Sequence, residues 1–264
     1  MSERANSNEG SMGAVNKLVG RVLRKAAQVI DPPPPIHFLQ DEYVTWLCYA
    51  NAGMLEKGNL YSIDYAIGHL PSKAPILEIG TFCGLSTNVI THFKRKHGVS
   101  NPLVTCDKWE FENVNGRATI PNSPVLFSDY KAFSKQSYIR NVELFSRDDL
   151  PFTFEMTADE FFQAWNEQKT CSDVLGRPYQ LGGPFSFCYI DGDHTYEHAK
   201  QDFLHCDACL EPGGFILFDD STLGDFTLHK LMPEVMALSR YRLVAVNPYH
   251  LFQKVAPASP SNGK

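Results

Sequence analysis

The chain has 264 residues, of which 43% are hydrophobic, and it carries a formal net charge of −6. This length fits one large domain, with or without additions at its ends. The acidic balance disfavours nucleic acid or an acidic membrane surface as the main partner, and no run of about 18 uncharged apolar residues indicates a membrane span.

The amino-terminal residues differ in character from the rest of the chain. Residues 1–12 are polar and include acids, which is unlike a secretory signal and predicts disorder. Residues 14–30 have helical periodicity with basic residues on one side. We interpret them as an amphipathic helix that packs on the domain or on a second subunit, rather than on a membrane surface. The "DPPPP" run at 31–35 ends this helix and predicts a stiff spacer.

These composition changes divide the chain into four parts. They are a disordered start, helix and proline-rich spacer (1–35), a helical cap or interface segment (36–72), the main domain (73–256) and a disordered tail (257–264). A homo-oligomer, if the chain forms one, is expected to use the N-terminal helices. The seven cysteines show no framework spacing, so we expect a reduced, cytoplasmic protein.

Apolar runs alternate with helical patterns throughout the main domain. Strands are expected at 75–80, 101–107, 152–156, 184–191 and 213–220, with two more within 240–254. Helices are expected at 85–98, 157–168 and 195–210. This alternation predicts an α/β fold that is Rossmann-like and doubly wound, with a mostly parallel sheet and helices on both faces. Ligands of such sheets bind beyond the carboxyl ends of the strands.

The first predicted strand ends in a glycine-containing turn, "EIGTFCGLST", which includes Glu78, Gly80 and Gly84. Glycines let the chain turn sharply and let a ligand approach the backbone. The turn is neither G-x-G-x-x-G nor a P-loop, which disfavours a dinucleotide phosphate site. Asp107 ends the second strand, where an acid would accept hydrogen bonds from both ribose hydroxyls. The pair suits a nucleoside without a pyrophosphate. In the alternative interpretation, Glu78 caps the turn and Asp107 caps a helix.

Four carboxylates follow the fourth and fifth strands: Asp191, Asp193, Asp219 and Asp220. One helix joins these two strands, so their ends should be level and the acids should converge. Either some of the acids take up protons or a cation lies between them. An all-oxygen set suits Mg²⁺ or another hard divalent ion. In the metal-free alternative, Asp220 only caps the helix after its strand.

The motifs "ILEIGTFCGLST", "YIDGDHTYEHAKQDF" and "LEPGGFILFDDS", together with "CD" at 106–107, resemble class I S-adenosylmethionine-dependent methyltransferases. More narrowly, they are similar to bacterial small-molecule O-methyltransferases, typified by the macrocin and novobiocin sugar enzymes. The resemblance covers roughly residues 60–220. It implies a seven-stranded sheet whose last strand is antiparallel, and S-adenosylmethionine as the cofactor.

The resemblance also implies roles for individual residues. The cofactor-binding set that it implies is Glu78, Gly80, Thr81, Gly84, Ser86, Asp107, Ala158, Asp159 and Asp191, with Ala158 and Asp159 against the adenine. Asp191, Asp219 and Asp220 match metal ligands, and Asp193 matches the general base. His194 is a rival base, with an ordinary pKa better suited to the task. The alternatives are that Asp159 serves only the first turn of its helix, and that Asp193 and His194 cap the following helix.

Two long segments between strands, 108–151 and 171–184, are expected to lie near the carboxyl-end rim, where they would form a lid or a substrate wall. Trp109, Phe111 and Tyr130 are candidates for an apolar wall, although each also suits an ordinary core position.

The sequence therefore predicts a divalent-metal-dependent O-methyltransferase that acts on a hydroxyl of a sugar or another natural product. Two alternatives are a metal-independent methyltransferase acting on nitrogen or carbon, and a catalytically silent protein that binds the cofactor as a scaffold. The motifs also resemble the cephalosporin hydroxylases, but no iron-type set of two histidines and a carboxylate can be placed in the sequence.

Overall fold

The computed structural model describes residues 38–110, 116–222, 224 and 226–255. All of them belong to one unit, Ile36–Lys264. The predicted disordered start, the helix at 14–30, the proline-rich spacer and the tail at 257–264 lie outside the described residues. Within the described part, no helix is both long enough and apolar enough to cross a membrane.

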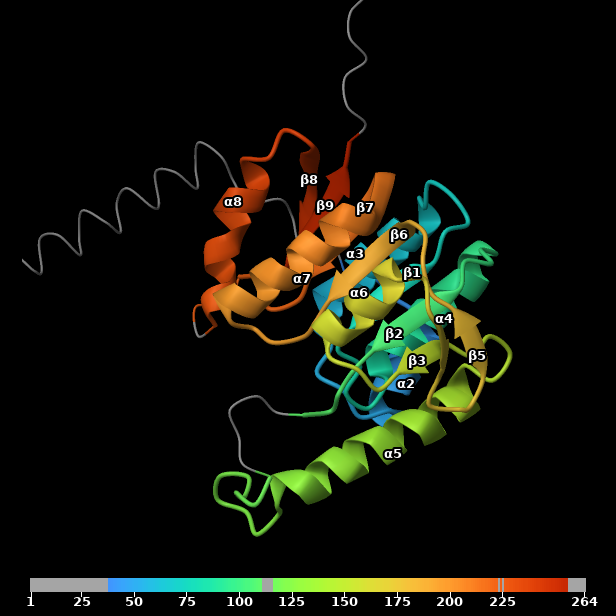
Figure 1. Cartoon of the computed structure of the whole chain (residues 1–264), viewed down its shortest axis with the longest axis vertical. Helices are drawn as coiled ribbons and strands as arrows, with labels where there is room; N and C mark the ends of the chain where they lie inside the picture. Colours follow the sequence, from blue (N-terminus) through green and yellow to red (C-terminus); the bar gives the residue numbers. More distant parts are fainter. Residues whose placement is uncertain (1–37, 111–115, 223, 225, 256–264) are drawn as a thin grey trace, which may run out of the picture. The chain divides into compact units, whose positions relative to one another are not determined.

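Seven strands form the central sheet. They are β1 (Ile76–Ile79), β2 (Leu103–Cys106), β3 (Phe152–Phe154), β6 (Phe185–Ile190), β7 (Leu210–Phe218), β8 (Tyr241–Val246) and β9 (His250–Lys254). Their order in the sheet is β3-β2-β1-β6-β7-β9-β8 (Figure 1). The first five pair in parallel, whereas β9 is antiparallel to both of its neighbours. The predicted fold class is confirmed, including the antiparallel last strand.

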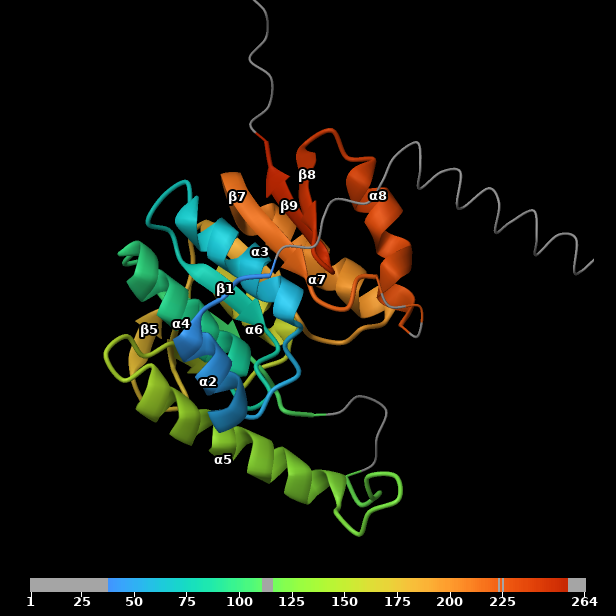
Figure 2. The same cartoon turned by 180° about the vertical axis from the view of Figure 1, so that it is seen from behind.

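Helices cover both faces of this sheet. Figure 1 shows α6 (Ala158–Asn166) and α7 (Tyr196–Cys209) in front of it. Figure 2, from behind, shows α2 (Glu42–Ala50), α3 (Lys57–Gly68) and α4 (Leu85–His97) on the opposite face. The long helix α5 (Phe127–Phe145) contacts α4, and a short 3-10 helix, η1 (Thr227–Leu231), leads into α8 (Met232–Met236).

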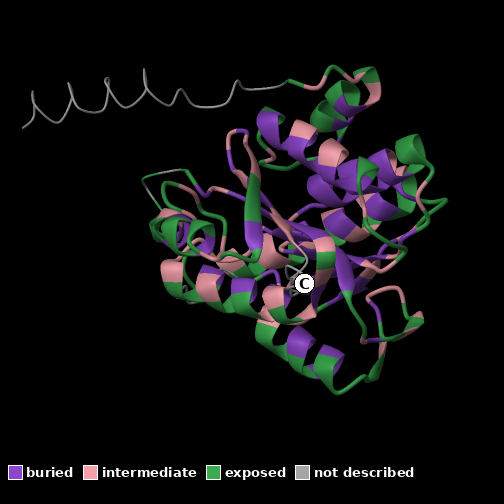
Figure 3. Ribbon diagram, turned by 90° about the horizontal axis from the view of Figure 1, so that it is seen from above, coloured by how far each residue is buried: buried purple, intermediate pink, exposed green. Residues whose placement is uncertain are grey.

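The strands are buried on both sides, which explains why they read as continuous apolar runs rather than as alternating ones. In β7, Ile216 and Phe218 pack into the core beneath α6 and α7, whereas Phe215 and Leu217 pack beneath α3 and α4. Figure 3 shows this arrangement, with buried strands in the middle and exposed residues on the outer helix surfaces.

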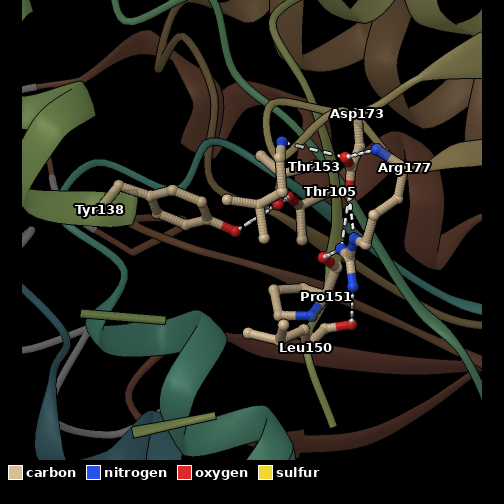
Figure 4. A network of polar contacts seen from close by, with 8 residues as sticks. Thr105, Tyr138, Leu150, Pro151, Thr153, Asp173 and Arg177 are labelled. Atoms are coloured by element: carbon tan, nitrogen blue, oxygen red, sulfur yellow. Dashed lines mark hydrogen bonds and ion pairs between the residues drawn. The ribbon is translucent and has the colours of Figure 1, made fainter. Parts of the chain in front are cut away.

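A polar cluster joins α5 to the neighbouring strands β2 and β3 (Figure 4). The hydroxyl of Tyr138 lies 2.5 Å from Oγ1 of Thr153, and Thr105 donates to the same oxygen over 2.9 Å. All three side chains are buried. The Tyr138 ring also closes the space beside Gly84, where an added Cβ would lie 3.1 Å from the ring. Helix α5 therefore supports the glycine turn after β1.

The insertion at 171–184 forms a two-stranded hairpin of β4 (Thr170–Ser172) and β5 (Pro178–Gln180). The guanidinium of Arg177 donates to the carbonyls of Leu150 and Pro151, which precede β3 (Figure 4). The hairpin therefore lies at the amino edge of the sheet, and the prediction that it lines the carboxyl-end rim was wrong. The physical reason is the direction of α6, which runs from the carboxyl edge of the sheet back to its amino edge. The segment that follows α6 and precedes the next parallel strand, β6, therefore lies at the amino edge.

Candidate active site

The turn after β1, residues Gly80–Gly84, is called the cofactor loop below. Gly80 and Gly84 have φ angles of +84° and +88°, a left-handed conformation that favours glycine. A Cβ at Gly80 would overlap the backbone carbonyl oxygen of Asp191. The loop therefore lies directly against the end of β6, and the two halves of the predicted site share a backbone contact.

Asp107, at the end of β2, holds the cofactor loop in place. Its Oδ2 accepts hydrogen bonds from Thr81 N at 2.7 Å, Thr81 Oγ1 at 3.0 Å and Phe82 N at 2.9 Å. Its Oδ1 accepts from Trp109 N at 2.6 Å. These four donors orient the carboxylate, and they give Asp107 a structural task in addition to the ribose-binding role, which stays a prediction.

The residues of the predicted aromatic wall occupy different environments. Trp109 is buried, and its Nε1 donates to the carbonyl of Phe82 over 2.8 Å, so it supports the cofactor loop from behind. Tyr130 lies with its ring 5.9 Å from that of Phe82 and is half-buried. Phe111 lies outside the described residues.

Glu78 lies in β1 beneath the cofactor loop and is fully buried. Thr87 donates to its Oε2 over 2.6 Å, and the side chain of Ser86 also contacts it. Its Oε1 has no hydrogen-bond partner among the described residues. Burial raises the pKa of Glu78 to about 8. An unpartnered buried carboxyl oxygen beside a glycine turn suits a ligand that brings a donor, such as the amino group of S-adenosylmethionine.

Ala158 and Asp159 begin α6, behind a capping box formed by Thr157 and Glu160. Ala158 packs against the core. Oδ1 of Asp159 lies 2.9 Å from Nε2 of His205 on α7, and most of the Asp159 side chain is exposed. The position of these residues against an adenine stays a prediction.

Two of the four predicted acids, Asp191 and Asp220, flank one histidine, and a third, Asp219, lies beside them. Since β6 and β7 are paired in parallel up to their last residues, Asp191, Asp219 and Asp220 follow at the same level of the sheet. The His194 ring lies between two of these carboxylates, with Nδ1 3.0 Å from Oδ2 of Asp220 and Nε2 3.5 Å from Oδ1 of Asp191. We call these four residues the acid cluster.

Charge in the acid cluster is unevenly shared. Burial, reinforced by the neighbouring carboxylates, raises the pKa of Asp219 well above its ordinary value, and burial also raises the pKa of Asp191. Burial acts in the same direction on Asp220, but its contacts with His194 outweigh it and lower the pKa. Burial opposes charge on His194, yet Asp191 and Asp220 together raise its pKa to about 10. The two flanking carboxylates therefore favour the protonated, imidazolium form of His194.

The fourth predicted acid, Asp193, faces the start of α7. Its Oδ1 accepts from Thr195 N over 2.6 Å and lies 3.5 Å from Nδ1 of His198. Thr195 is in turn the N-cap of α7. The Phe226 ring stands edge-on to the His194 ring, with centroids 4.7 Å apart, and forms one side of the acid cluster.

Asn59 and Tyr249 complete the acid cluster, although the sequence analysis named neither. Asn59 is fully buried on α3, and its amide donates to Oδ1 of Asp219. The Tyr249 side chain interacts with Asp220 and acts with His194 to lower its pKa. Asn59 shares a helix face with the buried Ile63, so a polar residue at an apolar-face position was the available signal.

The fit of a divalent ion was tested on the donor set. Three carboxylates have the right chemistry for Mg²⁺. Within the described ranges, however, no group of three or more histidine, cysteine, aspartate or glutamate side chains is arranged to hold a metal ion. The His194 ring lies between Asp191 and Asp220, where an ion shared by these two carboxylates would have to bind. The residues as arranged do not fit the metal, and the ligand roles of the three acids stay predictions.

Comparisons with solved structures show that the fold is shared with known methyltransferases. The O-methyltransferase from Bacillus cereus, solved with S-adenosylhomocysteine, is 15% identical over 89% of this chain and 97% of its own, with a TM-score of 0.51. TomG from Streptomyces achromogenes, an O-methyltransferase of tomaymycin synthesis solved with S-adenosylmethionine, is 13% identical over 83% and 92%, with a TM-score of 0.53. The calicheamicin methyltransferase CalS11 is 15% identical over 82% and 95%, with a TM-score of 0.50. At these identities the structures show a shared fold.

No curated protein matches the sequence. A family model described as a methyltransferase domain matches residues 77–221, which is more than half of the chain and includes both the cofactor loop and the acid cluster. The chain therefore belongs to the S-adenosylmethionine-dependent methyltransferases, the family that its motifs resemble.

Proposed function

We propose that this chain transfers a methyl group from S-adenosylmethionine to a hydroxyl oxygen of a small molecule, a sugar or another natural product. The observation that carries the proposal is the backbone contact between Gly80 and Asp191, which joins the cofactor loop to the acid cluster. An acceptor held by the acid cluster would lie beside the cofactor. The bound cofactor supplies an electrophilic methyl group on a sulfonium, so positioning of the acceptor does much of the work.

The residues divide the task between them. The cofactor loop and Glu78 hold the amino-acid part of the cofactor, and Asp107 holds its ribose. The imidazolium of His194 favours the acceptor hydroxyl in its deprotonated form, since a nearby positive charge lowers the pKa of that hydroxyl. A protonated imidazole has no lone pair with which to accept a proton. This argues against His194 as the general base, and Asp193 stays the candidate that the motif resemblance implies.

Metal dependence is the second candidate for the same chemistry, and the carboxylate pair Asp219 and Asp220 favours it. A divalent ion would supply the charge that His194 supplies in the present arrangement. Binding an ion between the carboxylates would require the His194 ring to leave its place between Asp191 and Asp220. The two candidates therefore make opposite predictions for the effect of a chelator.

The first experiment is calorimetric titration of the full chain with S-adenosylmethionine, once with Mg²⁺ and once with EDTA. We expect micromolar binding in both. Radiolabelled methyl transfer to a panel of nucleotide sugars and hydroxylated aromatic compounds then tests the reaction. Transfer that persists in EDTA supports His194 as the cation, and transfer that requires Mg²⁺ supports the metal. Binding without transfer to any acceptor or extract component supports the scaffold alternative, and no binding in either titration contradicts the proposal.

A further inference from the structure

Asn51, which follows α2 as its C-cap, makes three hydrogen bonds within the core although it lies outside the acid cluster and the cofactor loop. It is 1% exposed. Its Nδ2 donates to the carbonyl of Cys83 over 3.0 Å and to that of Ala52 over 2.8 Å. Its Oδ1 accepts from Nδ2 of Asn88 on α4 over 2.7 Å. The side chain therefore links α2 and α4 to the backbone of the cofactor loop.

A second asparagine converges on the same carbonyl. Nδ2 of Asn141, on α5, donates to the Cys83 carbonyl over 2.8 Å. The network continues from Asn88, whose Oδ1 accepts from Oγ of Ser146 at the end of α5 over 2.6 Å. A carbonyl oxygen has two lone pairs, and two asparagines from different helices use both of them at Cys83.

The Cys83 carbonyl controls the conformation of the cofactor loop. The carbonyl of Cys83 and the N–H of Gly84 share one planar peptide group. Gly84 N donates to the carbonyl of Thr81 over 2.8 Å, so this peptide group closes the loop. Fixing the Cys83 oxygen from outside therefore fixes the turn at Gly84 and the start of α4, which is the anion-attracting end of that helix.

Packing of the folded chain alone does not explain this choice of residues. Apolar side chains fill buried helix ends without requiring partners, whereas a buried amide destabilises the fold unless every group finds one. Gly53 adds a second constraint, because a Cβ there would overlap the Leu85 side chain at the start of α4. The segment after Asn51 is thus seated against the first residue of α4, and Figure 2 shows α2, α4 and α5 side by side on this face.

We propose that Asn51 is a positioning residue that holds the cofactor loop in its binding conformation, which makes the helical segment 38–72 part of the cofactor-binding machinery. The inference rests on the assignment of Gly80–Gly84 as the cofactor loop. Loss of the Asn51 amide leaves the Cys83 carbonyl with Asn141 as its one side-chain donor, and the loop then loses part of its preorganisation before the cofactor arrives.

The test is the affinity of full-length Asn51→Ala for S-adenosylhomocysteine, measured by titration calorimetry beside its thermal unfolding. We expect about 10- to 30-fold weaker binding, the effect of one buried hydrogen bond and its neighbours. Asn141→Ala removes the other donor to the same carbonyl from a half-buried position. It should weaken binding by about 5-fold, and it serves as the second test if Asn51→Ala does not fold.

Asn101→Ala is the matched control. Asn101 is also buried, and its Nδ2 donates to the carbonyls of Ser72 over 2.8 Å and Ala74 over 2.6 Å, at the amino edge of the sheet. It should lower thermal stability without changing the affinity. Equal loss of stability in the Asn51 and Asn101 variants, with unchanged affinity in both, would overturn the inference and leave the proposed function intact. If the wild-type chain binds no S-adenosylhomocysteine, both proposals fail.

Discussion

The cofactor loop and the acid cluster lie side by side at the carboxyl edge of one sheet, yet they are stabilised in opposite ways. Around the loop, Asp107 accepts four hydrogen bonds and the Cys83 carbonyl accepts two from side chains. In the acid cluster, Asp219 and Asp191 have raised pKa values, and Nε2 of His194 has no hydrogen-bond partner in the described part of the chain.

This difference indicates different relations to a ligand. Saturated polar groups fix the loop before any ligand binds, which is the preorganised half of the site. In the acid cluster, crowding and burial disfavour the charged carboxylates Asp191 and Asp219, and an acceptor, a proton or a cation can relieve this. Substitutions in the loop should therefore lower stability, whereas substitutions in the acid cluster should lower turnover and leave the fold unaffected.

The largest effect is expected for Gly80→Ala. The φ of +84° is unfavourable for alanine, and the new Cβ would overlap the Asp191 carbonyl. We expect the free energy of unfolding to fall by more than about 3 kcal/mol, with loss of measurable S-adenosylhomocysteine binding. Chemical denaturation and calorimetry check both quantities.

Gly98→Ala provides the control for backbone conformation alone. Gly98 ends α4 with a φ of +63°, and an added Cβ would meet nothing within 4 Å. It should lower the free energy of unfolding by only about 1 kcal/mol and spare binding. If the two alanine variants behaved alike, the contact between the loop and β6 would have no role of its own.

Glu78 differs from the other groups beneath the cofactor loop, because its Oε1 has no hydrogen-bond partner among the described residues and burial raises its pKa. We therefore expect the stability of the fold to depend on pH. Its pKa rises from 4.5 in the unfolded chain to about 8 in the folded one. The folded protein therefore binds the proton more tightly, and the resulting stability is present below pH 4.5 and is lost as the pH rises through about 8. At about 1.4 kcal/mol for each pKa unit the ceiling is near 5 kcal/mol. We expect about 2 kcal/mol between pH 5 and 9 after local relaxation.

Glu78→Gln should remove this share of the pH dependence, as measured by unfolding at a series of pH values without cofactor. His194 acts in the same direction, because its pKa is raised from 6.5 to about 10. Its contribution is lost at higher pH and should remain in the variant. A variant with the same slope as the wild type between pH 5 and 8 would assign the effect to other groups.

Much of the fold and part of the site followed from the sequence, for a physical reason. Buried strands read as apolar runs, and parallel pairing brings their ends level, so the convergence of Asp191, Asp219 and Asp220 was predictable. The contacts of Asn51 and Asn59 were not, because they join helices of the amino-terminal segment to residues 32 and 160 positions away. Such contacts depend on how helices pack on a sheet, which leaves little trace in local periodicity.

The position of His194 shows a second limit. Sequence adjacency to Asp193 indicated a competition between two bases, whereas the structure separates them. One faces the start of α7, and the other lies between two acids as a cation. Side chains of consecutive residues point in different directions and so enter different environments. The pKa of each side chain then depends on the burial and the charges around it, not only on the residue type.

Asp107→Asn tests the hydrogen bonds around the cofactor loop with a smaller structural change than Gly80→Ala. The amide nitrogen would face backbone donors, either at Thr81 and Phe82 or at Trp109, so at least one hydrogen bond is replaced by a repulsive contact. We expect the free energy of unfolding to fall by about 2 kcal/mol and S-adenosylhomocysteine to bind about 30-fold more weakly.

Asp173→Asn is its matched control. This buried carboxylate also orders a turn, accepting from Leu175 N at 3.0 Å and Arg177 N at 2.8 Å, but at the amino edge (Figure 4). It should show a similar fall in stability with unchanged affinity. Weaker cofactor binding in both variants would mean that affinity follows general stability rather than the loop.

The smallest effect on the fold is expected for Asp219→Asn, in the acid cluster. Because burial raises the pKa of Asp219, its charged form destabilises the folded protein as the pH rises, and an amide of the same shape removes that penalty. We expect the free energy of unfolding at neutral pH to stay within about 0.5 kcal/mol of wild type, and the cofactor affinity to stay within about twofold, while methyl transfer is lost. A fall in stability of about 2 kcal/mol or more would place Asp219 among the groups that hold the fold, as Asp107 does, because the loss of a satisfied buried hydrogen bond, such as the one from Asn59, has an effect of this size. Preserved folding with loss of methyl transfer would show that the acid cluster serves the reaction, whereas the groups around the cofactor loop serve stability.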